Sequence, residues 1–259
     1  MASKKIEALA DWLFDVTTGK KPWQDILEKE PKLSIDDAYR VQFALMKRLQ
    51  KAGDSVIGYK AALTSIAMQK DRGVDEPIMG ALLKSGLRQE GDVIDIVKNS
   101  RNAIECEVGV LLKKDLEGPG VTPFDAHNAV ECYMAAIEVA VAGSGGKRSH
   151  HMGIAGQKTT GTVLFGSKMV SPRGIDLKVE GAVLSINGQV RASATAVEVM
   201  GNPLNSLAYI ANRAAANGEK LKAGMVLITG SICPAFEVKA GDESRMDFTN
   251  LGTVSCRFK

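Results

Sequence analysis

The stretch IECEVGVLL, residues 104–112, decides how this chain is interpreted. Apolar residues alternate there with acidic or small ones, which is the pattern of a β-strand with one face in a protein interior. On such a strand Glu105 and Glu107 leave the same face, with Cβ atoms roughly 7 Å apart. Two interpretations remain: the two carboxylates share one cation, or this face of the strand meets water.

A third glutamate lies in a more apolar stretch. Glu138 interrupts AAIEVAVA, residues 135–142, which otherwise has the composition of a strand buried on both faces. An unpaired carboxylate there would be strongly destabilising or would take up a proton, so a partner is required. The partner is either an internal lysine or arginine, or a cation shared with Glu105 and Glu107. If the three carboxylates converge, ligation by oxygen alone favours Mg²⁺ or Mn²⁺ over Zn²⁺.

The composition excludes several classes of protein. With 259 residues, of which 45% are hydrophobic and 24% charged, the chain is neither disordered nor a coiled coil. Its 33 basic and 30 acidic residues are spread along the sequence, so we expect no nucleic-acid partner. No apolar run reaches the roughly 18 residues of a membrane span. The N-terminus does not resemble a signal peptide and the cysteines lack scaffold spacing, so we expect a cytoplasmic protein with reduced thiols.

The pattern of apolar residues changes near residue 53. Apolar positions recur at helical spacing from Lys4 to Thr18 and again from Ser34 to Lys51. Beyond Val56, short apolar runs are separated by Gly, Pro, Asn and Asp, which is typical of a β-rich body. We therefore expect an α+β fold, with a helical N-terminal segment over residues 1–85 and a β-rich domain over residues 86–259.

Two local signals lie within the predicted β-rich domain. Asn187-Gly188 separates two alternating runs, which predicts a β-hairpin with a two-residue turn. A helix is expected from Pro203 to Asn217, with Gly218 closing its C-terminal end. At least part of this domain is therefore antiparallel.

Five segments resemble the 2-oxopent-4-enoate hydratases and 4-oxalocrotonate decarboxylases of the fumarylacetoacetate hydrolase superfamily, in that family's order and approximate spacing. They are GYKAALTS at 58–65, IECEVGVL at 104–111, AIEV at 136–139, GNPLNSLAYIAN at 201–212 and LKAGMVLITG at 221–230. The resemblance implies a mixed β-roll fold and an Mg²⁺ or Mn²⁺ ion that chelates the carboxylate and 2-oxo oxygen of the substrate. Glu105, Glu107 and Glu138 match the family's metal ligands.

The resemblance also implies residues that act on the substrate. Lys60 matches a family lysine that orients substrate or transfers a proton, although a surface lysine at a strand end would look the same. Family members carry a serine near Thr159, so the hydroxyl is retained as Thr159 or Thr160. We expect Lys60 and Thr159 to be catalytic, and Leu63, Lys158 and Thr160 to contact the substrate.

Two departures from the family pattern bear on the reaction. Hydratases place an aspartate directly after the proline of a V-D-x-P-D-x-G segment, where this chain has Ile78. Isoleucine cannot transfer a proton, which favours decarboxylation over hydration. Residues 141–151 replace a D-S-R-type segment that helps to close the site. Their glycines suggest either a flexible lid whose cationic residues meet a distal carboxylate, or a surface loop.

The predicted function is that of a divalent-metal-dependent lyase acting on small 2-oxo acids in aromatic catabolism, 4-oxalocrotonate decarboxylase-like or 2-oxopent-4-enoate hydratase-like. One alternative is an acylpyruvate or fumarylacetoacetate-type C–C bond hydrolase. Lys158 mildly supports it, but none of the three histidines matches the base of those enzymes. Another alternative is a non-catalytic partner subunit of a hydratase/decarboxylase complex. We expect a homo-oligomer, and a complex with a pathway hydratase or decarboxylase is compatible with the resemblance.

Overall fold

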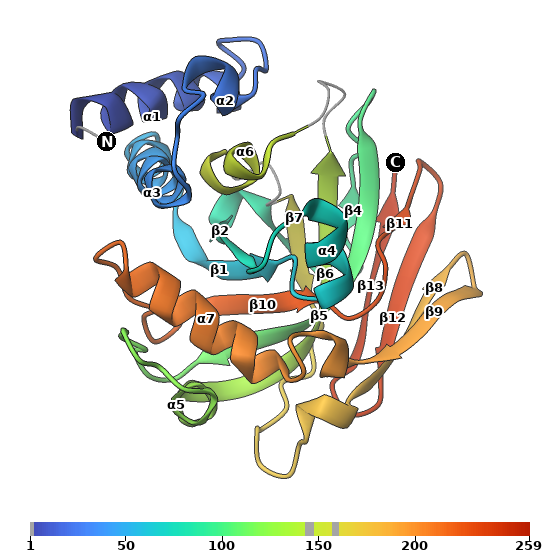
Figure 1. The fold of residues 1–259 in the computed structure, drawn as a ribbon. Coiled ribbons are helices and arrows are strands. Elements are labelled where there is room, and N and C mark those ends of the chain that lie inside the picture. The colour runs from blue at the N-terminus through green and yellow to red at the C-terminus, as the bar shows by residue number, and fades with distance from the viewer. Residues whose placement is uncertain (1–2, 143–147, 157–160) are drawn as a thin grey trace.

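The computed structural model describes residues 3–142, 148–156 and 161–259 (Figure 1). The N-terminal part consists of helices α1 (Ser3–Thr17), α2 (Ile26–Lys29) and α3 (Ile35–Lys51), and α1 packs against α3. The hydroxyl of Ser34 begins α3 by accepting a hydrogen bond from the backbone N–H of Asp37 at 3.1 Å. Both predicted N-terminal helices are confirmed, and α2 is an additional short one.

A mixed sheet forms the centre of the molecule. Among the described residues it has eight strands in the order β2-β1-β10-β5-β6-β7-β3, with β11 also paired to β5. These strands are β1 (Val56–Ala62), β2 (Ile78–Leu83), β3 (Leu87–Gln89), β5 (Arg101–Leu112), β6 (Val130–Ala142), β7 (Thr162–Phe165), β10 (Val226–Ser231) and β11 (Phe236–Glu237). Strands β5 and β6 are antiparallel neighbours, whereas β1 and β10 are parallel.

A second sheet packs against β6 through β12 and β13. Its order in the described residues is β4-β13-β12-β8-β9, formed by β4 (Val93–Ile94), β8 (Gly181–Ile186), β9 (Gln189–Thr195), β12 (Glu243–Phe248) and β13 (Gly252–Phe258). The turn between β8 and β9 has φ of 53° at Asn187 and 75° at Gly188. Both residues are left-handed, as a type I′ hairpin turn requires, so the predicted hairpin is confirmed.

Four α-helices connect and cover the strands in the described part of the chain. They are α4 (Ile66–Arg72), α5 (Pro123–Ala129), α6 (His150–Ala155) and α7 (Pro203–Ala215). Helix α7 lies against β1, β10 and α5, and it ends two residues before the predicted Asn217. Helix α6 packs against α3, so the N-terminal helices contact the body of the protein there (Figure 1).

The expected α+β fold, a mixed β-roll with a helical N-terminal segment, is confirmed. The division at residue 85 stays a prediction: the three N-terminal helices end at Lys51, and β1 and β2 precede residue 85 within the central sheet. In the part of the chain that the structure describes, no helix combines the length and the apolar character needed to cross a membrane.

Candidate metal centre

Three carboxylates meet on one face of the central sheet. Glu105 and Glu107 are two positions apart on β5, and Glu105 lies directly opposite Glu138 on β6. One oxygen from each carboxylate lies within 4.8 Å of the other two. Glu107 and Glu138 are 0% and 2% exposed. The interpretation in which this face of β5 meets water is therefore wrong, and the predicted convergence of the three side chains is confirmed.

Glu107 and Glu138 each accept a hydrogen bond through one carboxylate oxygen. The backbone N–H of Gly230, on β10, donates to Glu107 Oε2 at 2.6 Å. The Nζ of Lys60, on β1, donates to Glu138 Oε1, and both side chains of this ion pair are buried. The other two oxygens, Glu107 Oε1 and Glu138 Oε2, are buried without a hydrogen-bond partner among the described residues. Such atoms carry a desolvation cost that a bound cation would remove.

In the described part of the chain, the ionised carboxylates of this cluster outnumber the cationic side chains beside them. The internal lysine considered as a partner of Glu138 is present as Lys60, but among the residues that the structure describes only this one ammonium group pairs with the three carboxylates. Burial and the neighbouring carboxylates raise the pKa of Glu107 well above its ordinary value, and that of Glu105 to about 7. Burial opposes the charge of Lys60, yet the glutamates raise its pKa above the ordinary value. A divalent ion would supply the two missing positive charges, so the site fits Mg²⁺ or Mn²⁺.

Apolar side chains form the floor beside the carboxylates. A small buried cluster on this part of the sheet consists of Leu82, Ala136, Val163 and Ile228, with Phe165 packed against it. The ring of Phe165 lies over Gly109, since a Cβ on that glycine would be 2.7 Å from the ring. Val163 pairs with Glu138 across the β6–β7 ladder. The polar cluster therefore borders an apolar surface.

The remaining predicted site residues are only partly covered by the structure. Leu63 is half-buried and has a left-handed backbone with φ of 57°. Thr159, Lys158 and Thr160 lie outside the described residues, as does 143–147 of the divergent loop. Their expected contacts with substrate stay predictions.

One functional contact was missed by sequence reasoning. Gly230, whose N–H reaches Glu107, lies inside the strand run LITGS and has φ of 107°. A glycine within a strand often marks a bulge or a close approach of the backbone to another group. That signal was available in the LKAGMVLITG segment.

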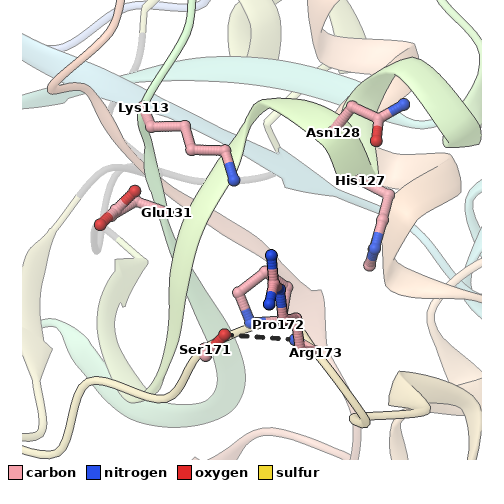
Figure 2. A pocket seen from close by; sticks show the side chains of 7 residues that line it. All are labelled: Lys113, His127, Asn128, Glu131, Ser171, Pro172 and Arg173. Atoms are coloured by element: carbon pink, nitrogen blue, oxygen red, sulfur yellow. Dashed lines mark hydrogen bonds between the residues drawn. The ribbon is translucent and has the colours of Figure 1, made fainter.

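A surface hollow lies apart from the carboxylates. Its volume is about 510 Å³. Figure 2 shows the side chains that line it, which come from Lys113 just after β5, from α5, from Glu131 at the start of β6 and from the 171–173 loop. Glu131 and Glu138 are seven residues apart on the extended strand β6, which corresponds to more than about 20 Å. The hollow is therefore not part of the candidate metal centre.

Comparison with known proteins identifies the family. Residues 48–259 match the family model described as the C-terminal domain of fumarylacetoacetate (FAA) hydrolase. The chain belongs to the fumarylacetoacetate hydrolase family. The family predicted from the five sequence segments is thus confirmed.

Similar proteins include both enzymes of the predicted branch. A 4-oxalocrotonate decarboxylase from Pseudomonas putida is 30% identical over 256 residues, covering 98% of this chain and 97% of the relative. A 2-keto-4-pentenoate hydratase from Paraburkholderia xenovorans is 29% identical over 265 residues, covering 100% of this chain and 97% of the hydratase. The two identities are nearly equal, so overall similarity does not distinguish decarboxylation from hydration.

A solved structure matches the whole chain. It is the 4-oxalocrotonate decarboxylase from Pseudomonas putida G7 complexed with magnesium and adipate. The TM-score is 0.93 at 30% identity, and the match covers 100% of this chain and 99% of the decarboxylase chain. A fumarylpyruvate hydrolase from Pseudomonas aeruginosa has a TM-score of 0.62 at 13% identity and covers 77% of this chain, which shows a shared fold alone.

Proposed function

We propose that this chain is a divalent-metal-dependent lyase that acts on small 2-oxo acids, of the 4-oxalocrotonate decarboxylase or 2-oxopent-4-enoate hydratase type, in aromatic catabolism. The observation that carries the proposal is the buried carboxylate cluster, two of whose oxygens have no hydrogen-bond partner within residues 3–142, 148–156 and 161–259. Its ligands would be Glu105, Glu107 and Glu138. The magnesium in the similar decarboxylase structure supports the choice of Mg²⁺ or Mn²⁺.

The proposed chemistry follows from the charge of the site. When bound, the divalent ion would stabilise negative charge that develops on the 2-oxo oxygen of the substrate, a requirement shared by loss of CO₂ and by enolisation before hydration. Lys60 would hold a proton at Nζ beside the reacting group, because the surrounding carboxylates favour its charged form. The floor around Phe165 would exclude bulk water. Thr159 is proposed as a second catalytic residue, with Leu63, Lys158 and Thr160 in contact with the substrate.

Decarboxylation is favoured over hydration by Ile78. Ile78 on β2 pairs with Ala62 on β1, and Gly80 pairs with Lys60. Because Ala62 is two positions from Lys60, Ile78 and Lys60 lie on the same face of the sheet. Ile78 is buried and packs near Gly153 of α6. An apolar side chain at this position leaves no group there to transfer a proton to the carbons that a hydratase protonates.

We expect Ile78→Asp to raise the rate of hydration of 2-hydroxypenta-2,4-dienoate relative to the rate of CO₂ release. A positioned acid or base typically contributes about 10²- to 10⁴-fold. Burying the new carboxylate should lower the thermal stability of the variant. The ratio of the two rates is measured for wild type, Ile78→Asp and the apolar control Ile78→Val. An unchanged ratio in folded Ile78→Asp would exclude Ile78 as a determinant of the reaction.

The proposed function is tested by turnover of a panel of mono- and dicarboxylic 2-oxo acids. CO₂ release and ultraviolet loss of the dienol are followed separately, with Mg²⁺ or Mn²⁺ and after removal of metal by chelator. We expect metal-dependent CO₂ release from a 2-oxo-hexenedioate-type substrate, lost on chelation and restored by Mg²⁺ or Mn²⁺ but poorly by Zn²⁺. Unchanged activity after thorough chelation would contradict the metal dependence.

The raised pKa values predict how metal binding depends on pH. Carboxyls must be ionised to bind the ion, and burial with the neighbouring carboxylates raises the pKa of Glu105 to about 7 and also raises that of Glu107. Protons therefore compete with the metal at low pH, and we expect the affinity for Mn²⁺ to rise between about pH 6 and pH 8. Calorimetric titration in buffers of different ionisation enthalpy measures the affinity and the protons released. An affinity that is constant over this range would be inconsistent with protonated ligands in the metal-free site.

We also propose that the protein forms a homo-oligomer in the cytoplasm and associates with a hydratase or decarboxylase of its pathway. Large apolar side chains on its surface support the assembly, including Ile66 at 70% and Phe124 at 73% exposure. Light scattering after size-exclusion chromatography, with and without the purified pathway enzyme, measures the mass of each assembly.

A further inference from the structure

Two turns with unusual backbone conformations lie next to each other near the carboxylates. Leu63 and Met200 are non-glycine residues with φ of 57° and 52°, a region that such residues rarely occupy. The N–H of Met200 donates to the carbonyl of Thr64 at 3.2 Å, which joins the two turns. Conformations of this kind persist only where the surrounding structure holds them, and they concentrate at functional sites.

The N-terminus of α7 fixes the turn at Met200. The side-chain amide of Asn205 donates to the carbonyl of Met200 at 2.8 Å. Asn202 caps the helix by accepting a hydrogen bond from the N–H of Leu204 at 3.0 Å, and Pro203 occupies the first helical turn. Met200 is thus held through its N–H by Thr64 and through its carbonyl by Asn205.

The side chain of Thr64 contacts Gly230. Thr64 is buried, and a Cβ built on Gly230 would lie 2.3 Å from its Oγ1 and 2.6 Å from its Cγ2. The threonine side chain therefore fills the space directly over the glycine. At this point β10 departs from its regular register with β5, between Ile228 and Ser231. The N–H of Gly230 is turned to Glu107 instead, at 2.6 Å from Oε2.

We propose that Asn205 and Thr64 are positioning residues of the metal centre, acting through Met200 and Gly230 on Glu107. The side-chain amide of Asn205 donates to the Met200 carbonyl, and the N–H of Met200 donates to the Thr64 carbonyl. The Thr64 side chain packs over Gly230, whose N–H donates to Glu107 Oε2. With that oxygen fixed, Glu107 Oε1, which has no partner among the described residues, is presented to the ion. This inference rests on the metal site of the proposed function.

Asn205→Asp and Asn212→Ala form the test pair. Aspartate keeps the shape of Asn205 but cannot donate to Met200. Asn212 is a matched control on the same helix, whose side-chain amide donates to the carbonyl of Val121 at 2.9 Å, in a loop away from the glutamates. Metal-free proteins are titrated with Mn²⁺, and the signal of the free ion is followed by electron paramagnetic resonance. We expect Asn205→Asp to bind Mn²⁺ about tenfold more weakly, as outer-shell substitutions do, and Asn212→Ala to bind like wild type.

Thr64→Ala provides a second variant in case Asn205→Asp does not fold. It removes the atoms over Gly230 and is expected to weaken Mn²⁺ binding by a similar factor. Thermal unfolding of the metal-free proteins establishes that each variant is folded. Folded Asn205→Asp and Thr64→Ala with wild-type Mn²⁺ affinity would overturn this inference while leaving the metal site intact. A wild-type protein that binds no Mn²⁺ would overturn the proposed function as well.

Discussion

Glu107→Gln protein is expected to fold but to turn over no 2-oxo acid. It should bind Mn²⁺ more than about 100-fold more weakly than wild type, a larger loss than substitutions of residues that only contact a metal ligand cause. The substitution removes one of three ligand charges from a site in which Glu107 is fully buried. An amide cannot replace that charge. Steady-state turnover and the metal content of the purified variant measure the two losses.

The stability of the same variant separates ligand loss from misfolding. In the metal-free protein, burial raises the pKa of Glu107, and repulsion from Glu138 and Glu105 raises it as well. Removing the Glu107 charge relieves this repulsion, so the midpoint of thermal unfolding of metal-free Glu107→Gln should equal or exceed that of metal-free wild type. Glu131→Gln is the control, because Glu131 is exposed on the same strand as Glu138. Full activity and unchanged metal content in folded Glu107→Gln would eliminate Glu107 as a ligand.

Lys60→Met is expected to destabilise the metal-free protein and to remove turnover. The substitution leaves Glu138 buried without its cationic partner, and breaking one side of a buried ion pair typically costs about 3–5 kcal/mol. Bound Mn²⁺ should restore part of the loss, because the ion supplies positive charge to the same carboxylate. The free energy of unfolding is measured in urea with and without Mn²⁺.

The exposed Lys113 supplies the control for this prediction. Lys113→Met removes the same charge at the surface hollow of Figure 2 and should leave stability within experimental error. Equal stability of Lys60→Met and Lys113→Met, with no response of either to Mn²⁺, would contradict the role given to Lys60.

The sequence pattern indicated the surroundings of each carboxylate, but it left open whether the three converge, and only the resemblance to the family implied that they share an ion. The two-residue spacing of Glu105 and Glu107 placed both on one face of a strand, and the apolar run around Glu138 showed that this residue needed a partner. The hairpin at Asn187-Gly188 followed from turn chemistry in the same way. Each of these features requires only a few neighbouring residues.

The partner of Glu138 could not be derived from local pattern. Lys60 and Glu138 are 78 residues apart, and their strands are not neighbours, since β10 and β5 lie between β1 and β6. The contact depends on the curvature of the sheet and the length of the lysine side chain. Resemblance alone singled out Lys60 in advance.

The positive φ values of Leu63 and Met200 could likewise not be predicted from the sequence. Leucine and methionine give no local signal for positive φ, in contrast to the Asn-Gly turn. Their conformations are imposed by hydrogen bonds between segments far apart in the chain, from Met200 to Thr64 and from Asn205 to Met200. Tertiary contacts therefore determine the surroundings of Gly230, whereas the three proposed ligands were named by the resemblance to the family.

The position of a bound metal ion is the most direct test of the account. Crystals grown with Mn²⁺ are measured at a wavelength where manganese scatters anomalously. We predict one strong anomalous peak between Glu105, Glu107 and Glu138, within coordination distance of an oxygen from each and adjacent to Lys60. An anomalous map with no peak among these three carboxylates, or with manganese only at surface sites such as the hollow near Glu131, would contradict the metal centre and the function built on it.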